Sequence, residues 1–422
     1  MEFSSEEIER RREERDRERK FMAAQMNALK IGAIVAAVVM VTCVAAILIA
    51  SGIAANRRPG ELASQPTTQP TEPAPTLPDT VITLVAGGDV NVTDKVVSAG
   101  LTPQGYNYAD IFLDVMPVIA GADVSVVNFE GVLAGAPYNG QSAPQELMQA
   151  LKDVGVDLVQ TANTKSISKG PLGLKSTLDG AYAAGLLPVG TFYSNDEFAE
   201  TGGFTIIEVQ GIRIAFVAFT KGMGVAKLPK GYENCVNLLY KDYTSTYQEV
   251  DKEGIKSVLK KVAAQKPDVT VAMLHWGSEY NDKKSDSQKT IVKLMQDNGV
   301  DAILGTHPHY VQEMEFDPDA GTFVAWSLGD LLGDAAKAGT NYSVLLELEI
   351  TKDGDTGAVS ITGYHYVPVF LEDTTADGGK LRLLRIEEAM ASYQNNAVNR
   401  VSEQTYKAMV NALERIEDRV KG

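Results

Sequence analysis

The chain has 422 residues, of which 44% are hydrophobic and 22% are charged, so it is long enough for a sizeable core and for two or three domains. Its net charge of −16 argues against a nucleic-acid partner, because neutralising phosphates requires a basic face and no lysine or arginine stripe follows residue 60. Two cysteines, Cys43 and Cys235, are too few for a disulfide framework and leave the compartment open.

The N-terminal region changes character abruptly at residue 31. Residues 1–30 mix many acidic and basic side chains, which predicts a solvated charged arm or, alternatively, a partner-binding helix. Residues 31–55 carry no charge and, at about 1.5 Å rise per residue, are long enough to cross a hydrocarbon core of about 30 Å. We interpret this segment as an uncleaved transmembrane helix, with a cleaved signal peptide as the alternative.

The charges around this segment predict its orientation. More lysine and arginine residues precede the segment than follow it, so the N-terminus is expected in the cytoplasm and the main domain outside a cell membrane that the chain spans once. Residues 56–80 are rich in proline and threonine and predict an extended linker between membrane and domain.

From residue 81 onward, short apolar runs alternate with stretches of helical periodicity. This alternation predicts an α/β domain over residues 81–370. The expected strands cover residues 81–86, 124–127, 158–161, 186–190, 269–274, 300–304 and 323–326, and residues 211–220 carry β pattern for two more strands. Residues 385–420 carry apolar side chains at helical spacing and predict an amphipathic helix packed on the domain, within a helical extension at 371–422.

Several of the expected strands are followed directly by metal-binding residue types. Asp89, Glu130, His275 and the pair His307 and His309 each lie just past a strand end. In open α/β sheets ligands bind at this edge, so we expect the five side chains to meet. In extended backbone His307 and His309 would point the same way, and imidazole and carboxylate groups are ligands for zinc and similar ions. The sequence therefore predicts a metal site.

Each of these residues also has a purely structural interpretation. Asp89 could be a turn or helix-capping residue, and Glu130 a solvent-exposed turn carboxylate. His275 could be a hydrogen-bonded, partly buried histidine, and His307 and His309 could lie in a surface turn. The fourth histidine, His365, lies in an alternating run and is interpreted as structural.

Five motifs resemble, in order, those of the CapA/PgsA-like family of capsule and poly-γ-glutamate synthesis proteins. They are GGDVN at 87–91, VVNFEG at 126–131, HWGSEY at 275–280, GTHPHYVQ at 305–312 and WSLGD at 326–330. The resemblance implies a four-layer αββα sandwich similar to calcineurin-like metallophosphatases. By position, Asp89, Glu130, His275, His307 and His309 would hold one or two divalent ions, Mn, Fe or Zn.

The chain departs from the family pattern at two places. The usual Ala-Asn-Asn-His reads Ala-Asn-Thr-Lys at 162–165, and the usual Ser-Leu-Gly-Asn ends here in Asp330. In the related phosphatases the Asn-His pair supplies a metal-bridging amide and a proton-donating imidazole. A protonated lysine cannot ligate metal and is a poor general acid near neutral pH, so a weak, mononuclear or absent metal stays open. We expect Asn163 and Lys165 to contact an anionic substrate, and we assign no catalytic residue.

The resemblance implies a membrane-anchored protein that acts outside the cell in the synthesis, export or anchoring of capsule or poly-γ-glutamate. Its expected partners are an anionic polymer such as poly-γ-glutamate, membrane synthase components and, through residues 31–55, the lipid bilayer. The alternative is a metal-dependent phosphoesterase or amide hydrolase of the cell envelope. An extracellular domain without a polymer role is a third possibility, because family membership is only analogy for substrate. Residues 221–247, with four tyrosines and three glycines, are a candidate lid over the site.

Overall fold

The computed structural model describes residues 77–398 and 400–421. The predicted charged arm at 1–30, the transmembrane helix at 31–55 and the linker up to residue 76 lie outside the described residues. Within the described ranges, no helix combines the length and the apolar character needed to cross a membrane. The fold below belongs to the second of two units, Pro75–Gly422.

The first sheet has a parallel centre extended by antiparallel strands. Its parallel strands are β1 (Thr80–Asn91), β4 (Val124–Glu130), β5 (Leu158–Gln160) and β6 (Leu187–Val189), and the short β13 (Asp330–Leu332) also pairs parallel with β1. The antiparallel strands on the other side of β1 are β14 (Tyr342–Lys352), β15 (Val359–Asp373) and β16 (Leu381–Arg385). The boundary predicted at residue 370 therefore falls inside β15.

The second sheet has the order β11 (Met314–Asp317), β12 (Thr322–Ala325), β10 (Ala302–Thr306), β9 (Val269–His275), β8 (Ile212–Thr220) and β7 (Thr205–Val209). Its four inner strands are parallel and its two edge strands antiparallel. A separate small hairpin joins β2 (Leu101–Thr102) to β3 (Gly105–Tyr106).

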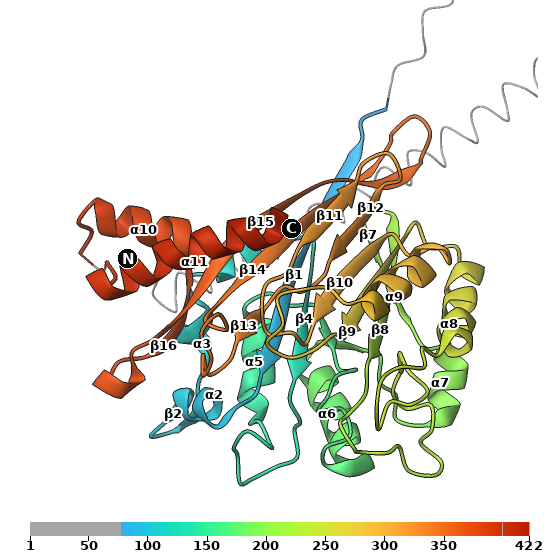
Figure 1. The fold of residues 1–422 in the computed structure, drawn as a ribbon, viewed down its shortest axis with the longest axis horizontal. Helices are drawn as coiled ribbons and strands as arrows, with labels where there is room; N and C mark the ends of the chain where they lie inside the picture. Colours follow the sequence, from blue (N-terminus) through green and yellow to red (C-terminus); the bar gives the residue numbers. More distant parts are fainter. Residues whose placement is uncertain (1–76, 399, 422) are drawn as a thin grey trace, which may run out of the picture. The chain divides into compact units, whose positions relative to one another are not determined.

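Helices cover the outer faces of both sheets (Figure 1). The first sheet is covered by α2 (Asp94–Ala99), α3 (Ala109–Phe112), α4 (Met116–Ile119) and α5 (Gln145–Asp153), and α6 (Gly170–Ala184) packs on α5 and β6. The second sheet is covered by α7 (Asn195–Thr201), α8 (Lys252–Ala264) and α9 (Asp286–Gln296). A 3₁₀ turn (Thr375–Asp377), α10 (Ile386–Gln394) and α11 (Glu403–Lys421) belong to the C-terminal part.

The period-two pattern of the strands explains how both sheet faces are buried. In β1, Leu84 points into the apolar layer between the sheets, where it shares a cluster with Phe216 of β8, whereas Val85 points toward the outer helices. A third apolar cluster lies between the second sheet and α8 and α9. The α/β class is thus confirmed, and the layers follow the order helix, sheet, sheet, helix.

The C-terminal extension differs from the single helix predicted over 385–420. Two helices form instead of one. The first, α10, ends at Gln394 and is followed by Asn395 as its C-cap. Asn396 then adopts the left-handed region at φ 53°, which asparagine tolerates better than most residues and which interrupts the helix. The extension also contributes the strand β16. The expected packing is confirmed, since α11 buries Met409, Ile416 and Val420 at helical spacing in the central cluster.

The start of α9 allows a first stability prediction. Ser285 accepts a hydrogen bond from the backbone N–H of Gln288, whose side chain in turn accepts from the backbone N–H of Ser285. Ser285→Ala is expected to lower the free energy of unfolding by about 1 kcal/mol in denaturant titration. Ser360→Ala, at an exposed position in β15, should change it by less than about 0.5 kcal/mol. Equal stability of the two variants would contradict the capping role.

Candidate metal centre

Strand ends of the two sheets meet at one edge and bring the predicted residues together. Asp89 lies near the end of β1 and Glu130 ends β4, both in the first sheet. His275 ends β9, and His307 and His309 follow β10, both in the second sheet. All five side chains are buried. The structural alternatives of an exposed Glu130 and a surface turn at 307–309 are therefore wrong.

The five side chains form overlapping sets of potential ligands. One set joins Glu130, His275 and His307, and a second joins Asp89, Glu130 and His309, with the ligand atoms of each set within 4.8 Å of one another. Glu130 Oε1 lies 3.6 Å from His275 Nε2, and Asp89 Oδ1 lies 3.7 Å from His275 Nδ1. The His275 and His307 rings are 4.6 Å apart at their centres. Distances of this size between the potential ligand atoms are compatible with one cation bound by several of these side chains.

Three buried ligand atoms have no hydrogen-bond partner among the described residues. They are Glu130 Oε2, His275 Nε2 and His307 Nδ1, one on each of the three residues of the first set above. An unpaired buried polar atom is costly, so such atoms in a native protein need an explanation. Carboxylate oxygen and imidazole nitrogen are the ligand types that zinc, manganese and iron accept. The residues present therefore fit a divalent metal ion.

The two loop histidines reach the site by a backbone that the sequence did not predict. His307 has φ 93° and His309 has φ 60°, so the pair is not extended, and the argument that extended backbone aligns their side chains is wrong. The His307 N–H donates to Asp89 Oδ2 at 2.9 Å, and His309 Nδ1 lies 2.7 Å from Asp330 Oδ1. Buried carboxylates hold this turn.

A buried amide pair supports the centre. Asn128 Nδ2 donates to Asp89 Oδ1 at 2.5 Å and lies 3.2 Å from His275 Nδ1. Asn163 Nδ2 donates to Asn128 Oδ1 at 3.0 Å and to the Phe129 carbonyl at 2.7 Å. Asn163 is buried and its amide positions Asn128, and its contact with substrate stays a prediction.

Sequence reasoning missed three residues of the site. Asn128 lies two residues before Glu130 in the same strand, and that spacing alone places both side chains on one face. Asp330 was noted only as a departure from a motif, although it contacts His309. Glu279, an exposed carboxylate in the HWGSEY motif, groups with His307 and His309 as a third potential ligand set. His365 is exposed on β15 and belongs to none of these sets.

The model of the family "Bacterial capsule synthesis protein PGA_cap" matches residues 83–335 of the chain. The chain belongs to this family. Its similar relatives include the PGA biosynthesis protein CapA of Bacillus subtilis (strain 168), 28% identical over 260 residues, which are 60% of this chain and 64% of the relative. The capsule biosynthesis protein CapA of Bacillus anthracis is 26% identical over 284 residues, 65% of each chain. The chain thus spans just under two thirds of these relatives.

Solved structures with a similar arrangement include a phosphatase from Mycoplasma pneumoniae and the calcineurin-like phosphoesterase YfkN from Bacillus subtilis. The first is 14% identical, with a TM-score of 0.42, and the match covers 71% of this chain and 98% of the phosphatase. The second is 14% identical, with a TM-score of 0.40, and the match covers 81% of this chain and 98% of YfkN.

Thr164 and Lys165, two of the three residues that depart from the family pattern, are half-buried beside Glu130. The Thr164 hydroxyl donates to Glu130 Oε1 in a short hydrogen bond, so it holds one carboxylate oxygen while Oε2 stays free. Lys165 is half-buried, and its positive charge favours the ionised form of Glu130. Neither replacement blocks the potential ligand atoms of this PGA_cap family member.

Burial controls the charges of the centre. It raises the pKa of Asp89 to about 6 and that of Asp330 to about 6, and burial together with the Asp89 charge raises the pKa of Glu130 to about 7. Burial also holds the pKa values of His275 and His307 well below the usual range, which keeps both rings neutral. Burial opposes the charged form of His309, but Asp330, Asp89 and Glu130 outweigh it and raise its pKa to about 10. A cation at this centre would relieve carboxylate repulsion.

The candidate lid, residues 221–247, is anchored on the domain at several points, although many of its residues are exposed. Residues 221–250 contain no helix or strand, and Tyr240 is buried with its hydroxyl 2.6 Å from Ser287 Oγ. Tyr240 and Tyr247 form an edge-to-face pair at 5.9 Å. Lys221, at the start of the segment, donates to the Gly277 carbonyl at 2.6 Å, next to the centre. Closure over the site stays a prediction.

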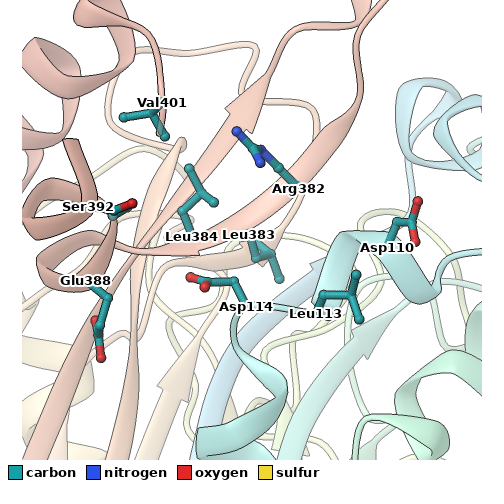
Figure 2. A pocket seen from close by; sticks show the side chains of 10 residues that line it. Asp110, Leu113, Asp114, Arg382, Leu383, Leu384, Glu388, Ser392 and Val401 are labelled. Carbon is teal, nitrogen blue, oxygen red and sulfur yellow. The ribbon is translucent and has the colours of Figure 1, made fainter. Parts of the chain in front are cut away.

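A cavity of about 380 Å³ lies between α3, β16 and α10. Figure 2 shows the side chains that line it. Its charged side chains are engaged in ion pairs: Asp110 with Lys380, Asp114 and Glu388 with Arg385, and Arg382 with Glu372. The described residues that line it therefore present no unpaired charge that would select a ligand.

Proposed function

We propose that this chain is a membrane-anchored component of capsule or poly-γ-glutamate synthesis that handles the anionic polymer outside the cell at a metal centre. Membership of the PGA_cap family and the names of the two Bacillus relatives support the polymer role. The anchor is the predicted helix at 31–55, and the expected partners are membrane synthase components.

The observation that carries the metal part of this proposal is the group of three unpaired ligand atoms on Glu130, His275 and His307. Asp89 and His309 lie beside them, and the Asn128 amide fixes the orientation of Asp89. When bound, a divalent ion would supply Lewis-acid polarisation of a phosphoryl or amide oxygen.

Lysines near the centre suit an anionic chain. Lys165 acts on Glu130, and Lys221 lies close enough for its charge to act on His307. Lys337 Nζ lies 3.6 Å from the ring centre of Tyr280, which stacks on His309 at 5.4 Å. In a chain with a net charge of −16, cations near three of the potential ligands create a local attraction for polyanions.

The test is binding of labelled poly-γ-glutamate to the full chain in detergent. Lys165→Gln/Lys221→Gln is expected to weaken binding about tenfold at low salt, because two of the attracting charges are removed. Lys256→Gln/Lys260→Gln, at exposed positions on α8, is the control with the same change in net charge. No binding by the wild type, or an equal loss in the control, would overturn the polymer role.

The clustered ligands also favour a second candidate function, a metal-dependent phosphoesterase or amide hydrolase. The same preparation should be assayed with a generic phosphoester and with γ-glutamyl oligomers, with and without added manganese. Hydrolysis that chelation abolishes would favour the hydrolase. Polymer binding without hydrolysis would favour a handling role and would agree with the loss of the family's proton-donating histidine at Lys165.

A further inference from the structure

The turn that carries the two loop histidines has a strained backbone. His307 and His309 both adopt positive φ, and residues other than glycine hold such angles only where the surroundings impose them. We call residues 307–310 the histidine loop. Three of its supports come from neighbouring parts of the domain: Asp89 accepts from the His307 N–H, Asp330 contacts His309, and the Tyr280 N–H donates to the Pro308 carbonyl at 2.8 Å.

A fourth support comes from the other end of the chain. The guanidinium of Arg419, near the end of α11, lies 4.8 Å from the ring centre of Tyr310 and 5.6 Å from that of Tyr342. Arg419 Nη2 lies 3.9 Å from Asp282, and the arginine side chain is only 16% exposed. An arginine over tyrosine rings is attracted by both charge and stacking. Arg419 of α11 therefore holds the Tyr310 ring in place.

From Tyr310 the contacts continue to a potential metal ligand. The Tyr310 ring meets Tyr280 edge-to-face at 6.1 Å, and Tyr280 stacks on His309 at 5.4 Å. The Tyr310 hydroxyl donates to the Ala338 carbonyl at 3.0 Å, which fixes the far end of the ring. These ring contacts form a continuous path from Arg419 through Tyr310 and Tyr280 to His309.

The helix that provides Arg419 is firmly seated but lies outside the segment that the family model matches. Met409, Ile416 and Val420 anchor α11 in the central apolar cluster, whereas the match ends at residue 335. The family match therefore gives no role to this helix. Its last turn lies beside the histidine loop, as the contact between Arg419 and the Tyr310 ring shows.

We propose that Arg419 is a positioning residue through which the C-terminal helix holds the histidine loop in its metal-binding shape. The inference rests on the proposed metal centre. Arg419 contacts no potential ligand directly; it acts through Tyr310 and Tyr280. Orientation of ligands by groups behind them is a common determinant of metal affinity.

The test compares Arg419→Gln with Arg415→Gln in the full chain. Arg415 is exposed one turn earlier on the same helix, so the two variants change charge and helix composition equally. Arg419→Gln is expected to bind Co²⁺ about three- to tenfold more weakly and to shift its visible absorption bands, which report ligand geometry. Arg415→Gln should match the wild type, and Arg419→Lys should recover part of the affinity because a cation remains over Tyr310.

Two further measurements separate the outcomes. Ser194→Ala removes the side-chain cap of α7, where Ser194 accepts from the Glu197 N–H, and should leave the Co²⁺ spectrum unchanged. A shift in that variant as well would assign the effect to general loosening and overturn the proposal. Hydrogen exchange of the histidine-loop amides needs no metal and should be faster in Arg419→Gln than in Arg415→Gln. If the wild type binds no Co²⁺, the metal centre fails, and exchange alone decides the role of Arg419. Unchanged affinity, spectrum and exchange would overturn it.

Discussion

Replacing His307 and His309 together with alanine is expected to abolish metal binding. The change removes His307 Nδ1, one of three unpaired buried ligand atoms, and the imidazole that lies between Asp89 and Asp330. The remaining potential ligands are Asp89, Glu130, His275 and the exposed Glu279, and affinity should fall by more than about 100-fold. Elemental analysis of the purified full chain should show near-stoichiometric metal in the wild type and none in the double variant.

The matched control is His365→Ala, which removes an exposed imidazole on β15. It should retain wild-type metal content. Metal that persists in the double variant would show that the ligand set is wrong. A wild type without metal, even after incubation with Mn²⁺, Fe²⁺ or Zn²⁺, would rule out the metal-dependent part of the proposed function and leave a polymer-binding domain on this fold.

The strand-end residues were predictable because their position depends on local pattern. An apolar run of strand length places the next polar residue at the sheet edge, and parallel strands align those edges. Asp89, Glu130 and His275 follow this rule, and the structure brings them together. The α/β class followed from the same alternation. That these residues bind a metal stays a prediction.

Other features depend on contacts that no local pattern encodes. The histidine loop takes its shape from the bond between the His307 N–H and Asp89, which are 218 residues apart. Arg419 reaches Tyr310 only because α11 folds back over β14 and β15. The break between α10 and α11 depends on one asparagine at positive φ within an otherwise helical pattern. Such features are set by tertiary packing, which overrides local propensity.

Gly88→Ala is expected to be strongly destabilising. A Cβ at Gly88 would lie 1.8 Å from the Gly329 carbonyl oxygen, a backbone atom that cannot turn aside. The adjacent Asp89 N–H donates to that same oxygen at 3.0 Å, so relief of the clash would break this bond. Overpacking against backbone with a lost hydrogen bond should cost more than about 4 kcal/mol or prevent folding.

Gly363→Ala is the control, because it also replaces a strand glycine, has no positive φ, and its Cβ would meet only Glu349 Cβ at 4.0 Å. Its denaturation midpoint should match the wild type or rise slightly. If Gly88→Ala folds with wild-type stability, β1 and the 328–330 turn are not as close as described. If Gly88→Ala folds with reduced stability, its metal content should fall as well. The close approach of the two chain segments at Gly88 places Asp330, the partner of His309, beside Asp89.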